Sequence, residues 1–225
     1  MFRFFPTFLA AVAATAQTSS PLQYTVFLGD QAQITSVAVD NSGSAYITGS
    51  TSAPLPVTAG AVDTSYTTPN CALPPTPSYP HSCQIVFAGK LNAEGTAFSY
   101  LTYLPVSASN NPRIAVDAQG DAWITGSTSW NSLPVTPGAV ESQVQGNGSG
   151  FVIKLNPSAS AILFATYLGG TAGIAALALD STGGAYITGF ASSGIPFTPG
   201  SFRRVRFALA CRTDLLTIVR QKPSR

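Results

Sequence analysis

Two cysteines and the single histidine lie close together in the sequence and are the first candidates for chemistry. Cys71 and Cys83 bracket a proline-rich stretch, YTTPNCALPPTPSYPHSCQ at 66–84, which also contains His81. Thiolate and imidazole groups bind zinc, but this trio offers neither a fourth ligand nor a C-x-x-C spacing. Two cysteines that bracket a loop in an oxidising compartment typically form a disulfide. We therefore expect a disulfide between Cys71 and Cys83 and no metal site.

Three aspartates recur in nearly the same stretch of sequence. The copies read VDNSGSAYITG at 39–49, VDAQGDAWITG at 116–126 and LDSTGGAYITG at 179–189. In an Asp-x-x-Gly turn the carboxylate accepts backbone N–H groups, and the glycine adopts the left-handed conformation that closes a type I turn with a bulge. A calcium loop needs several carboxylates, and only Asp117 has a second one near it, Asp121. We interpret these residues as structural turns: Asp40 and Gly43, Asp117 and Gly120, Asp180 and Gly183.

No other motif indicates a catalytic site or a cofactor. The chain has one histidine, no G-x-S-x-G stretch and no cluster of carboxylates in sequence. A carboxylate pair assembled from separate repeats remains an open alternative. The aromatic residues at equivalent repeat positions are predicted to pack between repeats (Tyr46, Trp123 and Tyr186). Trp130 lies outside the repeated stretch, and we consider it a candidate for stacking on a sugar ring.

The N-terminal segment 1–16 has the pattern of a secretory signal peptide. Arg3 is followed by the apolar run from Phe4 to Ala14 and by the small-x-small triplet Ala14-Thr15-Ala16. This run is too short for a stable membrane span, and no later stretch is long and apolar enough to be one. We expect cleavage before Gln17 and a secreted or periplasmic product.

Composition favours an all-β domain and excludes nucleic acid as a partner. Charged residues make up 9% of the chain, whereas it has 20 glycines and 17 prolines, which suits short strands joined by tight turns. Residues 17–202 contain three basic and eight acidic residues, a balance of −5, which gives no electrostatic footprint for nucleic acid. Seven of the eleven basic residues lie in 203–225 instead.

The repeat is longer than the turn stretch. Each copy is followed by a link, which reads LPVTAGAV at 55–62, LPVTPGAV at 133–140 and IPFTPGSF at 195–202. The second and third copies are also preceded by another predicted hairpin, at 87–104 and at 151–168. The spacing from Lys90 to Lys154 is almost the same as the spacing from Asp117 to Asp180. Two hairpins per period predict four strands, which is the size of a β-propeller blade. LQYTVFLG at 22–29 matches the second strand of the second hairpin, so the chain is predicted to enter part-way through a unit.

These motifs resemble the bacterial SBBP-type β-propeller repeat. The resemblance rests on TYLGG at 166–170 and on the V-D-x-x-G-x-A-Y-I-T-G, P-x-T-P-G-A and F-V-x-K-L-N stretches, and it covers roughly 22–65 and 85–202. It implies a propeller fold and an extracellular setting, and it brings no established catalytic residues. The predicted fold class is therefore all-β, with four-stranded antiparallel blades in an incomplete, open propeller.

Two segments depart from the repeat pattern. The stretch 66–84 is an insertion, and 203–225 is a basic tail that replaces the expected F-V-x-K-L strand, as a change of reading frame after codon 202 would produce. We expect three domains or segments, namely a signal peptide at 1–16, propeller repeats at 17–202 and the tail. Three strands in the first unit and four in each of the next two predict an open arc of eleven strands. We expect this arc to self-associate through exposed blade edges and the tail to be disordered or a loose helix.

We expect the protein to be a non-catalytic scaffold that binds an extracellular protein or carbohydrate, with the insertion as a candidate recognition loop. Two alternatives stay open. One is a propeller-type lyase or glycan hydrolase with its site in the central channel, and the other is a gene fragment without a role of its own.

Overall fold

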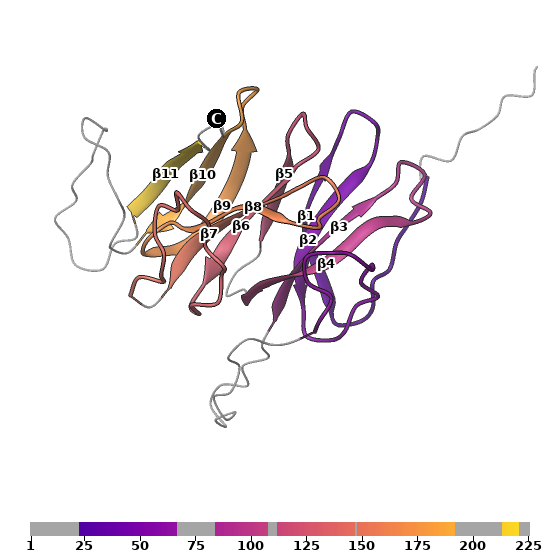
Figure 1. Cartoon of the computed structure of the whole chain (residues 1–225), viewed down its shortest axis with the longest axis horizontal. Coiled ribbons are helices and arrows are strands. Elements are labelled where there is room, and N and C mark those ends of the chain that lie inside the picture. Colours follow the sequence, from indigo (N-terminus) through magenta and orange to yellow (C-terminus); the bar gives the residue numbers. More distant parts are fainter. Residues whose placement is uncertain (1–22, 67–83, 108–111, 147, 192–212, 221–225) are drawn as a thin grey trace, which may run out of the picture.

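The computed structural model describes residues 23–66, 84–107, 112–146, 148–191 and 213–220 of the 225-residue chain. These residues form three antiparallel sheets that lie side by side in chain order (Figure 1), which confirms the predicted all-β fold class. The predicted signal peptide, Cys71 and Cys83 lie outside the described residues. None of the described residues belongs to a helix long and apolar enough to cross a membrane.

Each sheet is one blade whose strands follow one another in chain order. Blade 1 has β1 (Ala32–Val39), β2 (Ala45–Thr51), β3 (Ile85–Leu91) and β4 (Phe98–Ser107). Blade 2 has β5 (Arg113–Val116), β6 (Ala122–Thr128), β7 (Ser149–Leu155) and β8 (Ile162–Tyr167). Blade 3 has β9 (Thr171–Leu179), β10 (Gly184–Ala191) and β11 (Thr213–Arg220).

The first strands of the three blades lie along one side of the stack and contact each other, β1 with β5 and β5 with β9. We call these three the inner strands, and we call β4 and β8 the outer strands. The blades also share one register, because Val37 is opposite Ile47 in blade 1, as Ile114 is opposite Ile124 in blade 2.

Two expectations about strands were wrong. Residues 23–29 form no strand, because within the described chain no strand pairs with them. Instead their side chains pack on blade 1, where Val26 and Leu28 contact its apolar cluster. In the tail, 213–220 is neither disordered nor helical, since β11 pairs with β10 over its whole length. The described strands are therefore grouped as four, four and three, and each blade begins at the Asp-x-x-Gly hairpin.

Three apolar clusters hold the blades. The first lies between blades 1 and 2 and joins Tyr46, Val86 and Tyr100 to Ile124, Phe151 and Tyr167. The second lies between blades 2 and 3 and joins Trp123, Val152 and Phe164 to Ile174 and Ile187. The third, on the far side of blade 1, joins Phe87, Leu101 and Tyr103 to Leu55. Alternate residues of a strand face opposite sides of its sheet, so the buried strands of blade 2 serve both interfaces.

The link between the second and third strands returns across the blade to its outer strand. In blade 1, Thr58 N–H donates to Leu101 O at 2.9 Å, and Tyr103 N–H donates to Asp63 O at 3.0 Å. In blade 2, Thr136 N–H donates to Ala165 O at 3.0 Å. The outer edges of these two blades are thus covered by their own links, contrary to the expectation of open edges there.

Candidate functional site

Each Asp-x-x-Gly turn holds an aspartate whose carboxylate accepts several hydrogen bonds. In blade 1 one carboxylate oxygen of Asp40 accepts the N–H groups of Ser42 and Ser44, at 2.9 and 3.0 Å, and the Ser42 hydroxyl at 2.6 Å. The other oxygen accepts the Tyr46 hydroxyl at 3.2 Å. Gly43 has a φ of 84°, which an L-residue adopts only with strain. The carboxylate therefore replaces water for the turn's backbone donors.

Blades 2 and 3 repeat this geometry with small changes. Asp117 accepts N–H groups from Gln119 and Asp121 at 3.1 and 2.9 Å, and Asp180 accepts those of Thr182 and Gly184 at 2.8 Å each. The φ angles of Gly120 and Gly183 are both 83°. The aromatic position also repeats, with Trp123 Nε1 donating to Asp117 at 3.1 Å and Tyr186 bonding Asp180.

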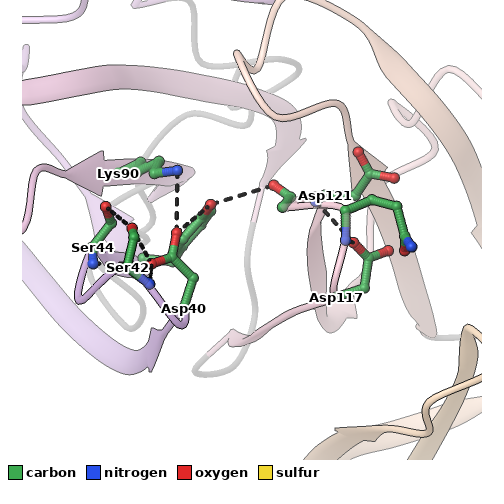
Figure 2. A network of polar contacts seen from close by, with 9 residues as sticks. Asp40, Ser42, Ser44, Lys90, Asp117 and Asp121 are labelled. Carbon is green, nitrogen blue, oxygen red and sulfur yellow. Dashed lines mark hydrogen bonds and ion pairs between the residues drawn. The ribbon is translucent and has the colours of Figure 1, made fainter.

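A lysine from the third strand closes the turn in blades 1 and 2. Figure 2 shows Lys90 above Asp40, with Asp117 and Asp121 in the neighbouring blade. Lys90 Nζ lies 3.3 Å from Asp40 and 4.7 Å from the centre of the Tyr46 ring. We call each set of turn carboxylate, lysine and aromatic ring a clasp. In blade 3 the register places Ile218 opposite Tyr186, where the other blades have lysine.

The clasp of blade 2 is the more highly charged of the two. Lys154 Nζ lies 2.8 Å from Asp121 and 3.1 Å from Asp117, and 4.9 Å from the centre of the Trp123 ring. Its side chain is only 13% exposed, so the ammonium group is largely removed from water. Two carboxylates and the face of an aromatic ring compensate for that desolvation.

The electrostatics favour the charged forms of Asp40, Asp180 and Lys154. Burial opposes ionisation of Asp40, but hydrogen bonds from the Ser42 hydroxyl, Ser44 N–H and Lys90 lower its pKa to about 2. The pKa of Asp180 is also lowered to about 2, first by the hydrogen bond from Gly184 N–H. Burial opposes protonation of Lys154, yet Asp121 and Asp117 together raise its pKa.

Polar contacts also join the blades. The Tyr46 hydroxyl lies 3.4 Å from Gly120 O, which connects the clasp of blade 1 to the turn of blade 2. On the inner strands, Thr35 Oγ1 donates to Pro112 O at 2.7 Å, and Arg113 Nε donates to Ala175 O at 3.0 Å. Arg113 thus lies among carbonyl groups where the three blades meet. The residues of the three inner strands other than Arg113 are uncharged.

Trp130, the candidate stacking residue, is half-buried at the start of the blade 2 link. Its N–H donates to Thr128 Oγ1 at 3.1 Å, and its carbonyl oxygen lies 3.4 Å from the Tyr167 hydroxyl. The backbone of Trp130 is therefore held by two hydrogen bonds, and the residue as a whole stays partly exposed. Trp130 lies in the link between β6 and β7, whereas the turn aspartates and glycines lie between the first and second strands of the blades.

The sequence reasoning did not assign a role to Lys90 and Lys154. The signal was present, because the two lysines are one repeat apart and are two of only three basic residues in 17–202. Each partner aspartate, however, lies in the preceding hairpin, on the far side of the long link between the second and third strands. Only the pairing of those two strands brings lysine and aspartate together.

The family comparison agrees with this architecture. A family model described as "SBBP: Beta-propeller repeat" matches residues 22–56, which include β1 and β2 with the turn of Asp40 between them. Residues 22–56 are thus similar to an SBBP β-propeller repeat. The SBBP match begins before β1, so the repeat includes the segment that precedes the hairpin. No curated protein matches the chain.

Proposed function

We propose that the protein is an exported β-propeller repeat protein that binds an extracellular ligand without transforming it. The observation that carries this proposal is that the two lysines of the repeats pair with the aspartates of the turns. Lys90, Lys154 and their aspartates form the clasps, so these groups are committed to holding turns. A general acid or base must instead reach a substrate proton with a titratable side chain.

The surface chemistry supports a neutral ligand. The inner strands carry small, hydroxyl and aliphatic side chains with one amide, Gln33, and one guanidinium, Arg113. A partly exposed tryptophan on a rigid link is suited to the apolar face of a sugar ring. We therefore propose a neutral glycan as the ligand class and Trp130 as one of its contacts.

Intrinsic fluorescence tests this proposal, because the chain has only two tryptophans. Trp123 is 0% exposed and Trp130 is half-buried, so added ligand should change the emission of Trp130 alone. Cello-, xylo- and chito-oligosaccharides are titrated into the full protein and into Trp130→Phe. We expect saturable quenching with at least one series in the wild type and none in Trp130→Phe.

Two results would contradict the proposal. Release of new reducing ends from any of these oligosaccharides would support the alternative of a glycan hydrolase. The absence of quenching by all three series would reject a neutral glycan contact at Trp130. Export is tested separately, by expressing the chain with its own N-terminal segment 1–16 and measuring its share in the bacterial periplasm and medium.

A further inference from the structure

The two internal interfaces between blades follow one rule. We call the side of a blade toward the preceding blade its N-face and the opposite side its C-face. On the N-face of blade 2, Ile114 is 5% exposed and Val116 packs in the same cluster with blade 1. On the N-face of blade 3, Leu177 and Leu179 pack against the cluster that contains Trp123 of blade 2. In both interfaces the N-face of one blade packs on the C-face of the blade before it.

The N-face of blade 1 presents the same residue types to water. Val37 and Val39 hold the register positions of Ile114 and Val116, since they pair with Ile47 and Ala45 of the next strand. They are 62% and 61% exposed. Large aliphatic side chains at matched positions are buried or half-buried in blades 2 and 3 and exposed in blade 1, which marks an interaction surface.

The C-face of blade 3 shows the complementary difference. Ala38 of blade 1 packs against the cluster shared with blade 2, whereas its register equivalent in blade 3, Ala178, is exposed. The aromatic residue after each Asp-x-x-Gly turn shows the same difference in exposure between the blades. Tyr46 and Trp123 are 0% exposed, but Tyr186 at the third such position is only half-buried.

Residues 23–29 sit on blade 1 as the outer strand of a preceding blade would. Their sequence YTVFLG at 24–29 parallels YLTYLP at 100–105 of β4. Tyr100 shares a cluster with Ala159, which lies in the turn of blade 2. Tyr24 correspondingly lies over Gly95 in the matching turn of blade 1, where an added methyl group would overlap its ring. Blade 3 meanwhile has three described strands, with β11 last in the order.

We propose that two copies of this chain associate head to tail, with the C-face of blade 3 of each copy on the N-face of blade 1 of the other. Residues 23–29 of one copy then add a fourth strand beside β11 of its partner. The described residues of each chain form three blades, so two copies supply six, within the ~4–8 blades at which propellers close. A head-to-tail contact of this kind closes into a ring when its rotation fits.

The first experiment measures the mass of the full protein in solution by light scattering and sedimentation at micromolar concentration. We expect a dimer for the wild type. Val39→Asp and Ala178→Arg place a charge on the N-face and the C-face, and each should weaken association more than about tenfold. Leu163→Asp is the matched control, because Leu163 is 41% exposed on blade 2, whose two faces are already occupied. It should stay dimeric.

The second experiment mixes the two charged variants. Val39→Asp keeps an intact C-face and Ala178→Arg keeps an intact N-face, so a mixture should recover one joint and form a heterodimer. Hydrogen exchange at 23–29 should be slow in the wild-type dimer and fast in each variant alone. Circular dichroism confirms folding, and Val37→Thr combined with Val39→Thr replaces Val39→Asp if the latter unfolds.

Three results would overturn the proposal. A monomeric wild type at micromolar concentration rejects association altogether. A dimer that Val39→Asp disrupts and Ala178→Arg leaves intact indicates that two N-faces meet. A ladder of species larger than two copies rejects closure at six blades.

Discussion

At the scale of single residues, the carboxylate of Asp40 has two roles, as a hydrogen-bond acceptor for the turn and as the counter-charge of a lysine. The turn leaves backbone N–H groups without partners inside the strand ladder, and Asp40 accepts two of them. The same group compensates for the charge of Lys90, whose ammonium group lies over the ring of Tyr46. Because both tasks need the ionised carboxylate, the stability of the turn depends on pH and on the lysine.

The first prediction concerns the pH dependence of stability. The folded-state pKa of Asp40 is about 2 against a reference value of 3.8, so its contribution is complete above pH 3.8 and is lost as the pH falls toward 2. We expect Asp40→Asn to flatten the dependence of the urea midpoint over this range. Asn41→Ala, in the same turn, is the control and should keep the wild-type slope. An unchanged slope in Asp40→Asn would contradict the role assigned to this carboxylate.

The second prediction compares the two lysines. Lys154→Met leaves Asp117 and Asp121 close together without a counter-charge, whereas Lys90→Met leaves only Asp40. We expect a loss of unfolding free energy of about 2 kcal/mol for Lys154→Met and about 1 kcal/mol for Lys90→Met, between the values of surface and buried pairs. Urea unfolding at neutral pH measures both. Equal losses would show that the second carboxylate adds nothing.

At the scale of elements, the link is the part of the repeat that protects the blade. An outer strand exposes backbone donors and acceptors to pairing with other chains. In blade 2 the hydroxyl of Thr136 accepts Ala165 N–H at 3.0 Å, and Thr166 Oγ1 accepts Val140 N–H at 2.7 Å. The P-x-T-P-G-A motif is therefore an edge cover, in which the threonine hydroxyl serves as a backbone substitute.

The third prediction tests this cover. Thr136→Val keeps the shape of the side chain but removes the acceptor for Ala165 N–H. The amide of Ala165 should exchange faster in hydrogen-exchange NMR, with a cost of about 1 kcal/mol in unfolding free energy. Thr136→Ser retains the hydroxyl and should exchange like the wild type. If both variants exchange alike, the hydroxyl does not protect the edge.

The hairpin turns and the all-β class could be predicted from the sequence. Which strands pair to form each blade could not. Strand alternation and Asp-x-x-Gly spacing are properties of a few adjacent residues, so the all-β class followed from them directly. The grouping of strands depends on partners far apart in the chain, and a periodic sequence does not show where one blade ends and the next begins. Residues 23–29 and 213–220 were misjudged for this reason, because strand formation there depends on a partner.

At the scale of the whole molecule, the blades are coupled through their faces. Blade 2 contributes to both internal clusters, with Ile124 and Phe151 on one side and Trp123 and Phe164 on the other. Blade 1 has a cluster on its far side that contains no residue of the other two blades. A change in one cluster should therefore loosen only the blades that share it.

The fourth prediction uses two phenylalanines to test this coupling. Phe164 is 6% exposed between blades 2 and 3, and Phe87 is 0% exposed in the far cluster of blade 1. Each Phe→Ala change should cost about 3–5 kcal/mol. Hydrogen exchange should rise in β9 and β10 for Phe164→Ala and stay near wild type there for Phe87→Ala. Uniform acceleration in both variants would indicate a single cooperative unit without separable interfaces.

The anchored link also makes the protein a natural scaffold for peptide display. The connection between β2 and β3 spans 52–84 in blade 1, and the one between β6 and β7 in blade 2 is shorter and spans 129–148. Despite this difference in length, both return to the outer strand through the same hydrogen bonds, at Thr58 and at Thr136. Doubling a flexible loop adds only about 0.6 kcal/mol of closure cost. A foreign sequence inserted after Asp63 would thus leave the blade's pairing intact and be presented from a fixed base.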